Sequence, residues 1–339
     1  MLKRIISSLG WAALLVSPMA AQTYWSSVVP NCSSLYFGAT AVAITNAGTT
    51  VGYSCVMSST FVWYSAGGGW GSSIRVAAPS TGAIGVQYTF FDNSGNAVNL
   101  DYQPSGGSPV LGTNRYGVAL YANQPSSFNL FGLSTNAPGY STTATGTVYV
   151  TYYCPDAVTC ASTNPQLLYS ALPTYPWSLS ILAAADTNLA YAWSAEGIDD
   201  GAANKVALVI YNESTAASTF NVRVFDRTGA LVASAATPSI PGLINLGGGN
   251  WGEGGTWASP TLLRGMIPNL PAGVFKVLVD GGTTLCAVAL LQFNGLSATT
   301  LQVSPDAPVV VGDVPATSLK PVVARRASST VLAFPGFAQ

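Results

Sequence analysis

Two copies of one pattern constrain the fold of this chain most: an alternating segment followed by an Asp-x-Ser/Thr-Gly turn. The first copy is FFDNSGNAV, residues 90–98, and the second is VFDRTGALV, residues 224–232. Apolar and polar side chains alternate before each turn, in VQYTF (86–90) and in FNVRV (220–224). This period of two indicates a β-strand with one buried face. The repeat therefore predicts two β units of the same kind.

The turns themselves have a structural explanation. Asp92 and Asp226 stand first, and Gly95 and Gly229 stand fourth. A carboxylate in the first position accepts hydrogen bonds from the backbone amides that follow, and glycine adopts the positive φ needed at the end. We predict two hairpin tips, each a type I turn closed by a glycine bulge. Calcium binding by either aspartate is the alternative, but each stands alone among acidic residues.

The remaining segments favour an all-β fold. GTVYVTYY (146–153), KVALVIY (205–211), GVFKVLV (273–279) and LCAVALLQF (285–293) are rich in β-branched and aromatic residues and are bounded by turn formers. The chain is longer than the domains that a single hydrophobic core usually supports. We therefore expect two tandem antiparallel β-sandwiches. The predicted division is a signal peptide at 1–21, sandwiches at 22–165 and 166–305, and an extended proline-rich tail at 306–339.

The N-terminus has the pattern of a secretory signal. Lys3 and Arg4 precede an apolar run at 5–16, and the small residues of SPMAAQ suit cleavage near Ala20 or Ala21. That run is shorter than the roughly 20 residues of a membrane-spanning helix, and no later run reaches that length. We expect a bacterial protein that is secreted or held in the cell envelope, with no transmembrane segment in its mature part.

Five cysteines in an exported chain suggest disulfides. Cys154 and Cys160 flank a Pro-Asp turn and are close enough to form a small loop. Cys32 and Cys55 are the next plausible pair. Cys286, within an apolar segment, remains as a buried thiol.

Charge and residue content exclude several classes of function. Only 7% of residues are charged, with 12 basic and 13 acidic side chains. Such a chain has little with which to neutralise a phosphate backbone, so we expect no nucleic-acid partner. The absence of histidine excludes Ser-His-Asp and Cys-His nucleophile systems and histidine-ligated zinc. We expect a protein that is not an enzyme and needs no cofactor, with bound Ca²⁺ as the one exception considered.

Two groups of residues remain as candidate sites. The first is acidic: Glu196, Asp199 and Asp200 form one cluster, and Glu253 lies in a second glycine-rich loop. Together they suit a calcium site, a catalytic pair of carboxylates, or ordinary solvated loop acids. The second group is aromatic, since Trp70, Trp251 and Trp257 lie in glycine-rich surroundings. Exposed rings there would stack on sugars, whereas buried rings would close the ends of the sandwiches.

The segment WYSAGGGWGSSIRV (63–76) leads into a strand, an Asp-x-x-Gly hairpin and another strand. This arrangement resembles the immunoglobulin-like or fibronectin-like sandwich modules found in tandem in secreted bacterial proteins. The second copy, WSAEGIDDGAANKV (193–206), departs from the pattern by losing one tryptophan and inserting acidic residues. The resemblance covers roughly residues 61–293 and implies a fold, because such modules carry many unrelated functions.

These observations lead us to expect a non-catalytic binding or structural protein, such as an adhesin-like, matrix or cell-envelope component. One alternative is a carbohydrate-binding protein or, as a variant of it, a hydrolase using the acidic loops. Another is a self-assembling surface subunit whose tail, residues 306–339, pairs with a sheet edge of a neighbour. Glycans and other cell-surface proteins are the partners these hypotheses imply.

Overall fold

The computed structural model describes most of the chain between residues 24 and 306. The described residues are 24–32, 40–46, 48–67, 70–77, 79, 82–104, 107–108, 110–122, 126–133, 144–161, 165–171, 178–182, 184–185, 189–199, 205–247, 250–259, 262–270, 273–293, 298–301 and 303–306. The fold is all-β, with strands paired in antiparallel sheets, as the sequence predicts. The predicted signal peptide and residues 307–339 of the predicted tail lie outside this part.

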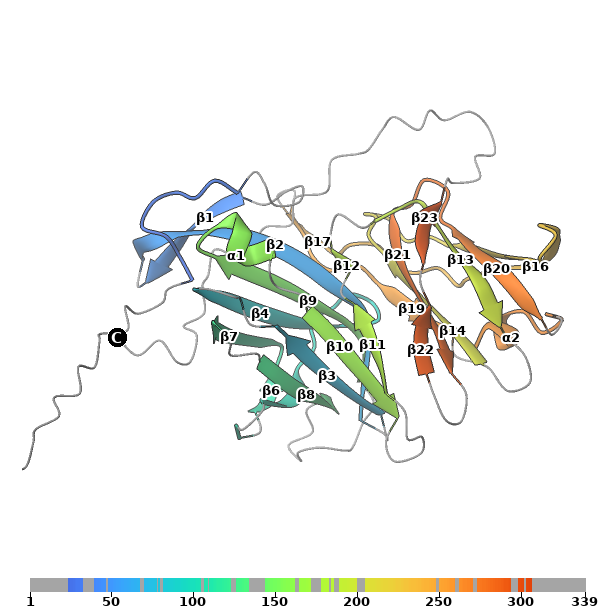
Figure 1. The fold of residues 1–339 in the computed structure, drawn as a ribbon, viewed down its shortest axis with the longest axis horizontal. Helices are drawn as coiled ribbons and strands as arrows, with labels where there is room; N and C mark the ends of the chain where they lie inside the picture. Colours follow the sequence, from blue (N-terminus) through green and yellow to red (C-terminus); the bar gives the residue numbers. More distant parts are fainter. Residues whose placement is uncertain are drawn as a thin grey trace, which may run out of the picture.

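Two sheets pack face to face at the N-terminal side; we call them the N-terminal sheet pair (Figure 1). One sheet has the order β1-β2-β9-β4-β7, with β12 also pairing with β2, and the other has the order β11-β10-β3-β8-β5-β6. The first contains β1 (Thr40–Asn46), β2 (Thr49–Ala66), β4 (Ala83–Asp92), β7 (Arg115–Tyr121), β9 (Ala144–Cys154) and β12 (Ala184–Ala185). The second contains β3 (Trp70–Val76), β5 (Leu100–Pro104), β6 (Val110–Thr113), β8 (Ser126–Leu133), β10 (Pro165–Ala171) and β11 (Ser178–Leu182).

The remaining sheets form the C-terminal sheet pair (Figure 1). One has the order β16-β15-β20-β13-β23 and the other β19-β14-β21-β22, while β17 and β18 form a separate hairpin. The strands are β13 (Ala192–Asp199), β14 (Lys205–Asn212), β15 (Asn221–Phe225), β16 (Leu231–Ala236), β17 (Asn245–Gly247), β18 (Asn250–Trp251), β19 (Thr256–Ala258), β20 (Val274–Asp280), β21 (Cys286–Phe293), β22 (Ala298–Leu301) and β23 (Ser304–Asp306).

The alternation read from the sequence sets the inner and outer faces of β4. Val86, Tyr88 and Phe90 are fully buried in the N-terminal core, whereas Gln87 and Thr89 point to the outer face. Successive side chains of a strand point to opposite faces, so a single register decides the whole pattern. The outer face of β4 is therefore polar, and this face later proves to be part of the candidate site.

The N-terminal core is rich in tyrosine. Tyr88 and Tyr116 stack with ring centroids 6.0 Å apart, and Tyr102 lies 4.8 Å from Tyr116. Burial, together with the neighbouring Tyr116, raises the pKa of Tyr102 to about 12. Burial likewise raises the pKa of Tyr64 well above its usual range, and its hydroxyl has no hydrogen-bond partner among the described residues. These phenols therefore stay neutral at any physiological pH.

Both predicted turns have the expected local geometry. The Asp92 carboxylate accepts the N–H groups of Ser94 and Asn96 at 2.8 and 2.9 Å, and Gly95 has φ of 83°. Asp226 accepts the N–H groups of Thr228 and Ala230 at 2.8 and 3.0 Å, and these bonds, with the Thr228 hydroxyl first, lower the pKa of Asp226. In both copies the aspartate carboxylate is used by its own turn.

The two copies differ beyond the turn. The second copy is a hairpin in which β15 pairs directly with β16. In the first copy pairing after the turn is limited to the Phe91–Ala97 bridge, and the chain then crosses to β5 in the facing sheet. The expected hairpin is thus complete only in the C-terminal copy.

Strand pairing places the division between the sheet pairs later than residue 165. The strand β10 pairs with β3, and β12 pairs with β2, so residues up to 185 belong with the N-terminal sheets. At the other end, β23 extends to Asp306 and pairs with β13, so the C-terminal sheets include the first residue assigned to the tail.

The predicted disulfides Cys32–Cys55 and Cys154–Cys160 are both present, with Cα–Cα distances of 5.6 and 5.4 Å. Because Cys55 lies opposite Cys154 in the β2–β9 ladder, the two bonds meet at one end of these strands. Cys154 ends β9, and Cys160 lies in the short helix α1 (Ala157–Ala161). Two disulfides are compatible with a secreted protein.

Helices contribute little to the described part of the chain. Besides α1, it contains α2 (Leu262–Met266), and each helix is five residues long. Neither is long and apolar enough to cross a membrane.

Cys286 is a buried free thiol, as the sequence suggests. Its side chain is fully buried, and the thiol donates to the carbonyl of Ala190 at 3.4 Å. Burial, reinforced by the charge of Asp280, raises the pKa of Cys286 to about 12. Thiolate, the reactive form, is therefore scarce at neutral pH.

This burial predicts the reactivity of the thiol. With four cysteines in disulfides, the native protein should give no rapid reaction with Ellman's reagent at pH 8, whereas in guanidinium it should release one equivalent per chain. A rapid reaction of the native protein with Ellman's reagent would contradict either the disulfide pairing or the burial of Cys286.

Candidate functional site

The two sheet pairs pack against each other through an apolar cluster at the centre of the molecule (Figure 1). The buried residues of this junction cluster are Val62 of β2, Val209 and Tyr211 of β14, and Ala287 and Ala289 of β21. Val62 follows the inward-facing Phe61 and so points to the outer face, and the shift of the β2–β9 register between Phe61 and Tyr64 returns Tyr64 to the inner face. Such a bulge re-aims side chains locally, so Phe61 and Tyr64 stay in the N-terminal core while Val62 faces β14.

Hydrogen bonds join the two pairs beside this cluster. The hydroxyl of Thr256 donates to the carbonyl of Val62 at 2.8 Å, and its backbone N–H donates to the carbonyl of Asn93 at 3.0 Å. The carboxylate of Glu253 accepts a hydrogen bond from the hydroxyl of Tyr211 and lies 3.5 Å from the hydroxyl of Thr60. Glu253 is only 2% exposed, so these polar contacts satisfy a carboxylate that would otherwise be costly to bury.

The first of the two repeated turns is part of the junction. A Cβ atom at Gly95 would lie 2.5 Å from the carbonyl oxygen of Glu253, whereas one at Gly229 would meet nothing within 4 Å. Both glycines have φ of 83°, so the backbone requirement is the same at the two sites. Only the first turn also needs glycine for close approach to another part of the chain.

A cleft of about 390 Å³ opens beside the junction. Its floor is the outer face of the N-terminal sheet, with Gln87 and Thr89 from β4, Tyr149 and Thr151 from β9, and Arg115 from β7. One side is bounded by Phe91 and by the first repeated turn, residues 95–97, together with Asn114. The opposite wall, which we call the wall hairpin, runs from Ile244 to Glu253 in the C-terminal sheet pair and includes Leu246 and Gly252.

Strand register arranges the floor in one cross-strand row. Arg115 lies opposite Thr89, Thr89 opposite Tyr149, and Tyr149 opposite Thr60. Neighbouring strands are about 4.8 Å apart, so the row spans roughly 14 Å. Because Glu253 contacts Thr60, the row has a guanidinium at one end, a carboxylate at the other and an aromatic ring between them.

The floor has unused hydrogen-bonding capacity. Gln87, which lines the cleft, accepts the hydroxyl of Tyr153 at 3.3 Å through its carbonyl oxygen, and its amide nitrogen forms no hydrogen bond within the described residues. Burial raises the pKa of Tyr153 to about 12, and the nearby charge of Arg115 partly offsets this. Within the described part of the chain, Arg115 forms no ion pair. The cleft can therefore offer a ligand several donors and one positive charge.

Of the acidic residues singled out from the sequence, the side chains of Glu196 and Glu253 are described, and they have different partners. Glu196 is exposed and lies 3.6 Å from Lys276, which also contacts Asp306 at 3.3 Å. Glu196 contacts Lys276 on the exposed face of the β13–β20 sheet, whereas Glu253 contacts Tyr211 on the outer face of the facing sheet, and packed sheets lie about 10 Å apart. Paired-carboxylate hydrolysis needs separations of about 5 to 9.5 Å. Glu196 and Glu253 therefore do not form such a pair.

The calcium hypothesis stays a prediction. The side chain of Asp199 and the whole of Asp200 lie outside the described residues, so only Glu196 of that cluster is placed. Elsewhere in the described ranges, no group of three or more acidic, cysteine or histidine side chains is arranged to hold a metal ion.

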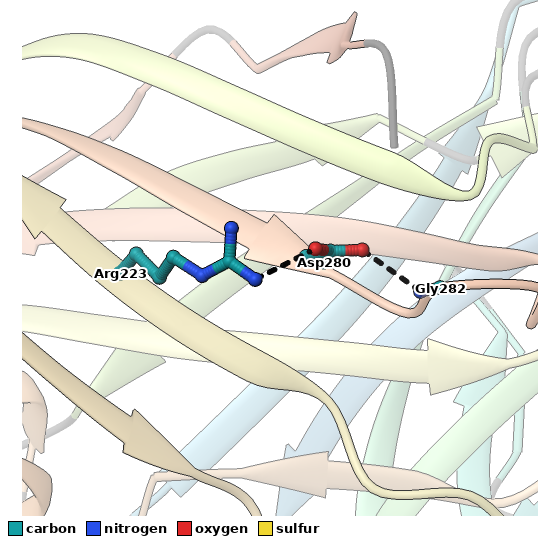
Figure 2. Close-up of polar contacts among 3 residues, drawn as sticks. All are labelled: Arg223, Asp280 and Gly282. Carbon is teal, nitrogen blue, oxygen red and sulfur yellow. Dashed lines mark hydrogen bonds and ion pairs between the residues drawn. The ribbon is translucent and has the colours of Figure 1, made fainter. Parts of the chain in front are cut away.

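A different buried carboxylate, Asp280, has a structural role (Figure 2). It forms an ion pair with Arg223 at 3.1 Å and accepts the backbone N–H of Gly282 at 2.8 Å. The first contact joins β15 to β20, and the second fixes the turn that leads to β21. Sequence reasoning did not single out this residue, because only the register of β15 and β20 brings Arg223 near it.

The predicted tryptophan surface stays a prediction, because only Trp257 of the three tryptophans has a described side chain. Trp257 is half-buried and packs against the C-terminal core. Trp251 lies in β18 of the wall hairpin and Trp70 begins β3, but their side chains lie outside the described part of the structure. The aromatic residues lining the cleft are Tyr149 and Phe91. The alternation of the strands that carry these two residues can be read from the sequence. The sequence does not show that a distant hairpin borders the outer face of these strands.

Comparison with protein-family models, with curated proteins and with solved structures finds no match to this chain.

The two repeated turns provide a matched pair of substitutions. A non-glycine residue at positive φ costs about 1–2 kcal/mol, so Gly229→Ala should lower the free energy of unfolding by about that amount. Gly95→Ala should cost clearly more, because its Cβ would also collide with the backbone of Glu253. Urea unfolding followed by tryptophan fluorescence measures both. Equal losses would show that the first turn does not pack closely against Glu253.

Glu253 should stabilise the junction, whereas Glu196 should not matter. Glu253→Ala leaves the buried Tyr211 hydroxyl without its acceptor and should cost about 1–3 kcal/mol of unfolding free energy. Glu196→Ala removes an exposed ion pair and should change stability by less than about 0.5 kcal/mol. The same unfolding experiment distinguishes them, and a neutral Glu253→Ala would argue against the junction described here.

Proposed function

We propose that this chain is a non-catalytic binding protein of the extracellular space or cell envelope, and that the cleft between its sheet pairs is the ligand site. We interpret each sheet pair as an immunoglobulin-like sandwich module. Two disulfides and the N-terminal signal pattern support the location. An adhesin-like or matrix role agrees with the low charge of the chain, only 7% of its residues.

One observation carries the proposal: the cleft is built by two parts of the chain that are distant in sequence and held together by a buried network. Its floor belongs to the N-terminal sheet pair and its opposite wall to the C-terminal pair. Ligand sites are commonly found where domains meet, and they combine apolar and aromatic surface with a few oriented polar groups. Tyr149, Phe91 and Ile244 supply the apolar surface here, while Gln87 and Arg115 supply polar groups.

Binding, rather than catalysis, fits the chemistry of the lining. Of the residues that line the cleft, Glu253 is the one acidic side chain, and its carboxylate already accepts a hydrogen bond from Tyr211. General acid–base chemistry by carboxylates uses two groups with different tasks. The lining is better suited to hold a polar molecule than to transform it.

A pair of tryptophan substitutions tests the cleft as the binding site. Thr89→Trp should fill the centre of the floor, whereas Ser234→Trp places the same side chain on the exposed face of β16, at the opposite side of the molecule in Figure 1. Co-sedimentation with insoluble polysaccharides and bacterial cell-wall preparations measures binding, with and without Ca²⁺. We expect retention of the original protein and of Ser234→Trp, and loss of retention for Thr89→Trp.

Retention of Thr89→Trp equal to that of the original protein would show that binding occurs elsewhere. Retention of none of the three proteins on any preparation would contradict the proposed function. Equal thermal unfolding temperatures of the two variants would establish that a loss of binding does not come from misfolding.

A further inference from the structure

We infer that the ligand of the cleft is an acidic saccharide, a chain of sugar rings that carries carboxylate groups. This inference rests on the proposed binding function and names its ligand class. One carboxylate of the ligand would lie on Arg115, a ring would lie on Tyr149, and hydroxyl groups would point toward Glu253.

Arg115 determines the charge of the ligand. Its side chain is exposed at the end of the floor and has no ion-pair partner among the described residues. The planar guanidinium of arginine donates two parallel hydrogen bonds to a carboxylate, which adds geometric selectivity to the charge. The chain as a whole has a formal net charge of −1, so its overall charge would not attract anions. The attraction of an anionic ligand to the cleft would therefore come from the guanidinium of Arg115.

The aromatic and apolar parts of the cleft suit sugar rings. Tyr149 lies next to Thr89 in the cross-strand row, and Phe91 lies at the end nearer the first repeated turn. Ile244 and Leu246 face them from the wall hairpin, and Leu246 is 66% exposed. A sugar ring has apolar C–H faces and a polar rim, so it can contact aromatic and aliphatic side chains with its faces while its hydroxyl groups form hydrogen bonds.

The polar groups of the floor suit hydroxyl groups. The side chains of Thr89, Thr151 and Asn114 form no hydrogen bonds within the described residues, and the amide nitrogen of Gln87 is also unused. These groups can donate and accept hydrogen bonds at neighbouring positions on the surface of the cleft. A ligand with many hydroxyl groups would satisfy several of them at once.

The two ends of the floor give the ligand a direction. Glu253 lies at the end opposite Arg115, beyond Tyr149 and Thr60 in the row. A second carboxylate of the ligand placed near the charge of Glu253 would be repelled, whereas an uncharged hydroxyl group would not be. The acidic end of the saccharide therefore belongs at Arg115.

An acidic peptide fits the same floor less well. Peptides commonly bind sheets by pairing with a free strand edge. Both edges of β4 are occupied, by β7 on one side and β9 on the other, so the floor offers side chains and no free backbone groups. A nucleic acid would need several cations, and Arg115 is the sole basic residue in the lining described here.

The test compares two ligands that differ in the charge of one carboxyl group. A sugar trimer whose one acidic residue is a terminal galacturonate has the same rings and hydroxyl groups as its methyl ester, and titration calorimetry at low salt measures both. We expect the acid to bind at least about tenfold more tightly than the ester, since charge-assisted hydrogen bonds are stronger than neutral ones. Arg115→Gln should abolish this difference. Arg75→Gln, which removes an equally exposed arginine from β3 in the facing sheet, should preserve it.

The possible failures are distinguishable. Equal binding of acid and ester, lost in Thr89→Trp but unchanged in Arg115→Gln, would overturn the acidic ligand and leave the binding function intact. Displacement of the trimer by acetate at similar concentration would reduce the site to a simple anion site and also overturn the inference. Binding of neither trimer, while cell-wall preparations are still retained through the cleft, would exclude uronic acid chains as the ligand.

Discussion

The buried contact between Glu253 and Tyr211 is the interaction on which the candidate site depends. It places a carboxylate where the outer faces of two sheets meet, with Thr60 of the N-terminal pair beside it. Removing such a group from water is unfavourable unless hydrogen bonds replace its hydration. The contact therefore favours one relative position of the sheet pairs, and with it the distance between the floor of the cleft and its wall.

The internal repeat shows how one turn can acquire two different roles. Both copies use an aspartate to hold the turn and a glycine to close it. The C-terminal copy ends in solvent, whereas the N-terminal copy packs against the backbone at Glu253 and borders the cleft. The difference comes from the neighbours of the turn and not from the turn itself. A local motif thus explains the scaffold, while the long-range packing explains the site.

The features that could be predicted from the sequence are those that depend on residues close together in the chain. The all-β class, both turns, both disulfides and the buried thiol follow from residue types and spacing. The cleft does not, because Arg115, Thr89 and Tyr149 become neighbours only through the register of three strands. The tryptophan and acidic residues were candidates because they lie in glycine-rich segments or form a cluster, and of these Glu253 is the one in the described lining, where it holds two sheets together.

The position of the two disulfides has a consequence for how the chain is oxidised. Cys55 and Cys154 face each other across β2 and β9, at a separation that cross-strand neighbours share with disulfide-bonded pairs. Once these two strands align, the shortest route to a covalent bond joins the wrong partners and leaves Cys32 and Cys160 reduced. Correct pairing then depends on order: either the flanking segments deliver their thiols before the central ladder closes, or a disulfide isomerase reshuffles the early product.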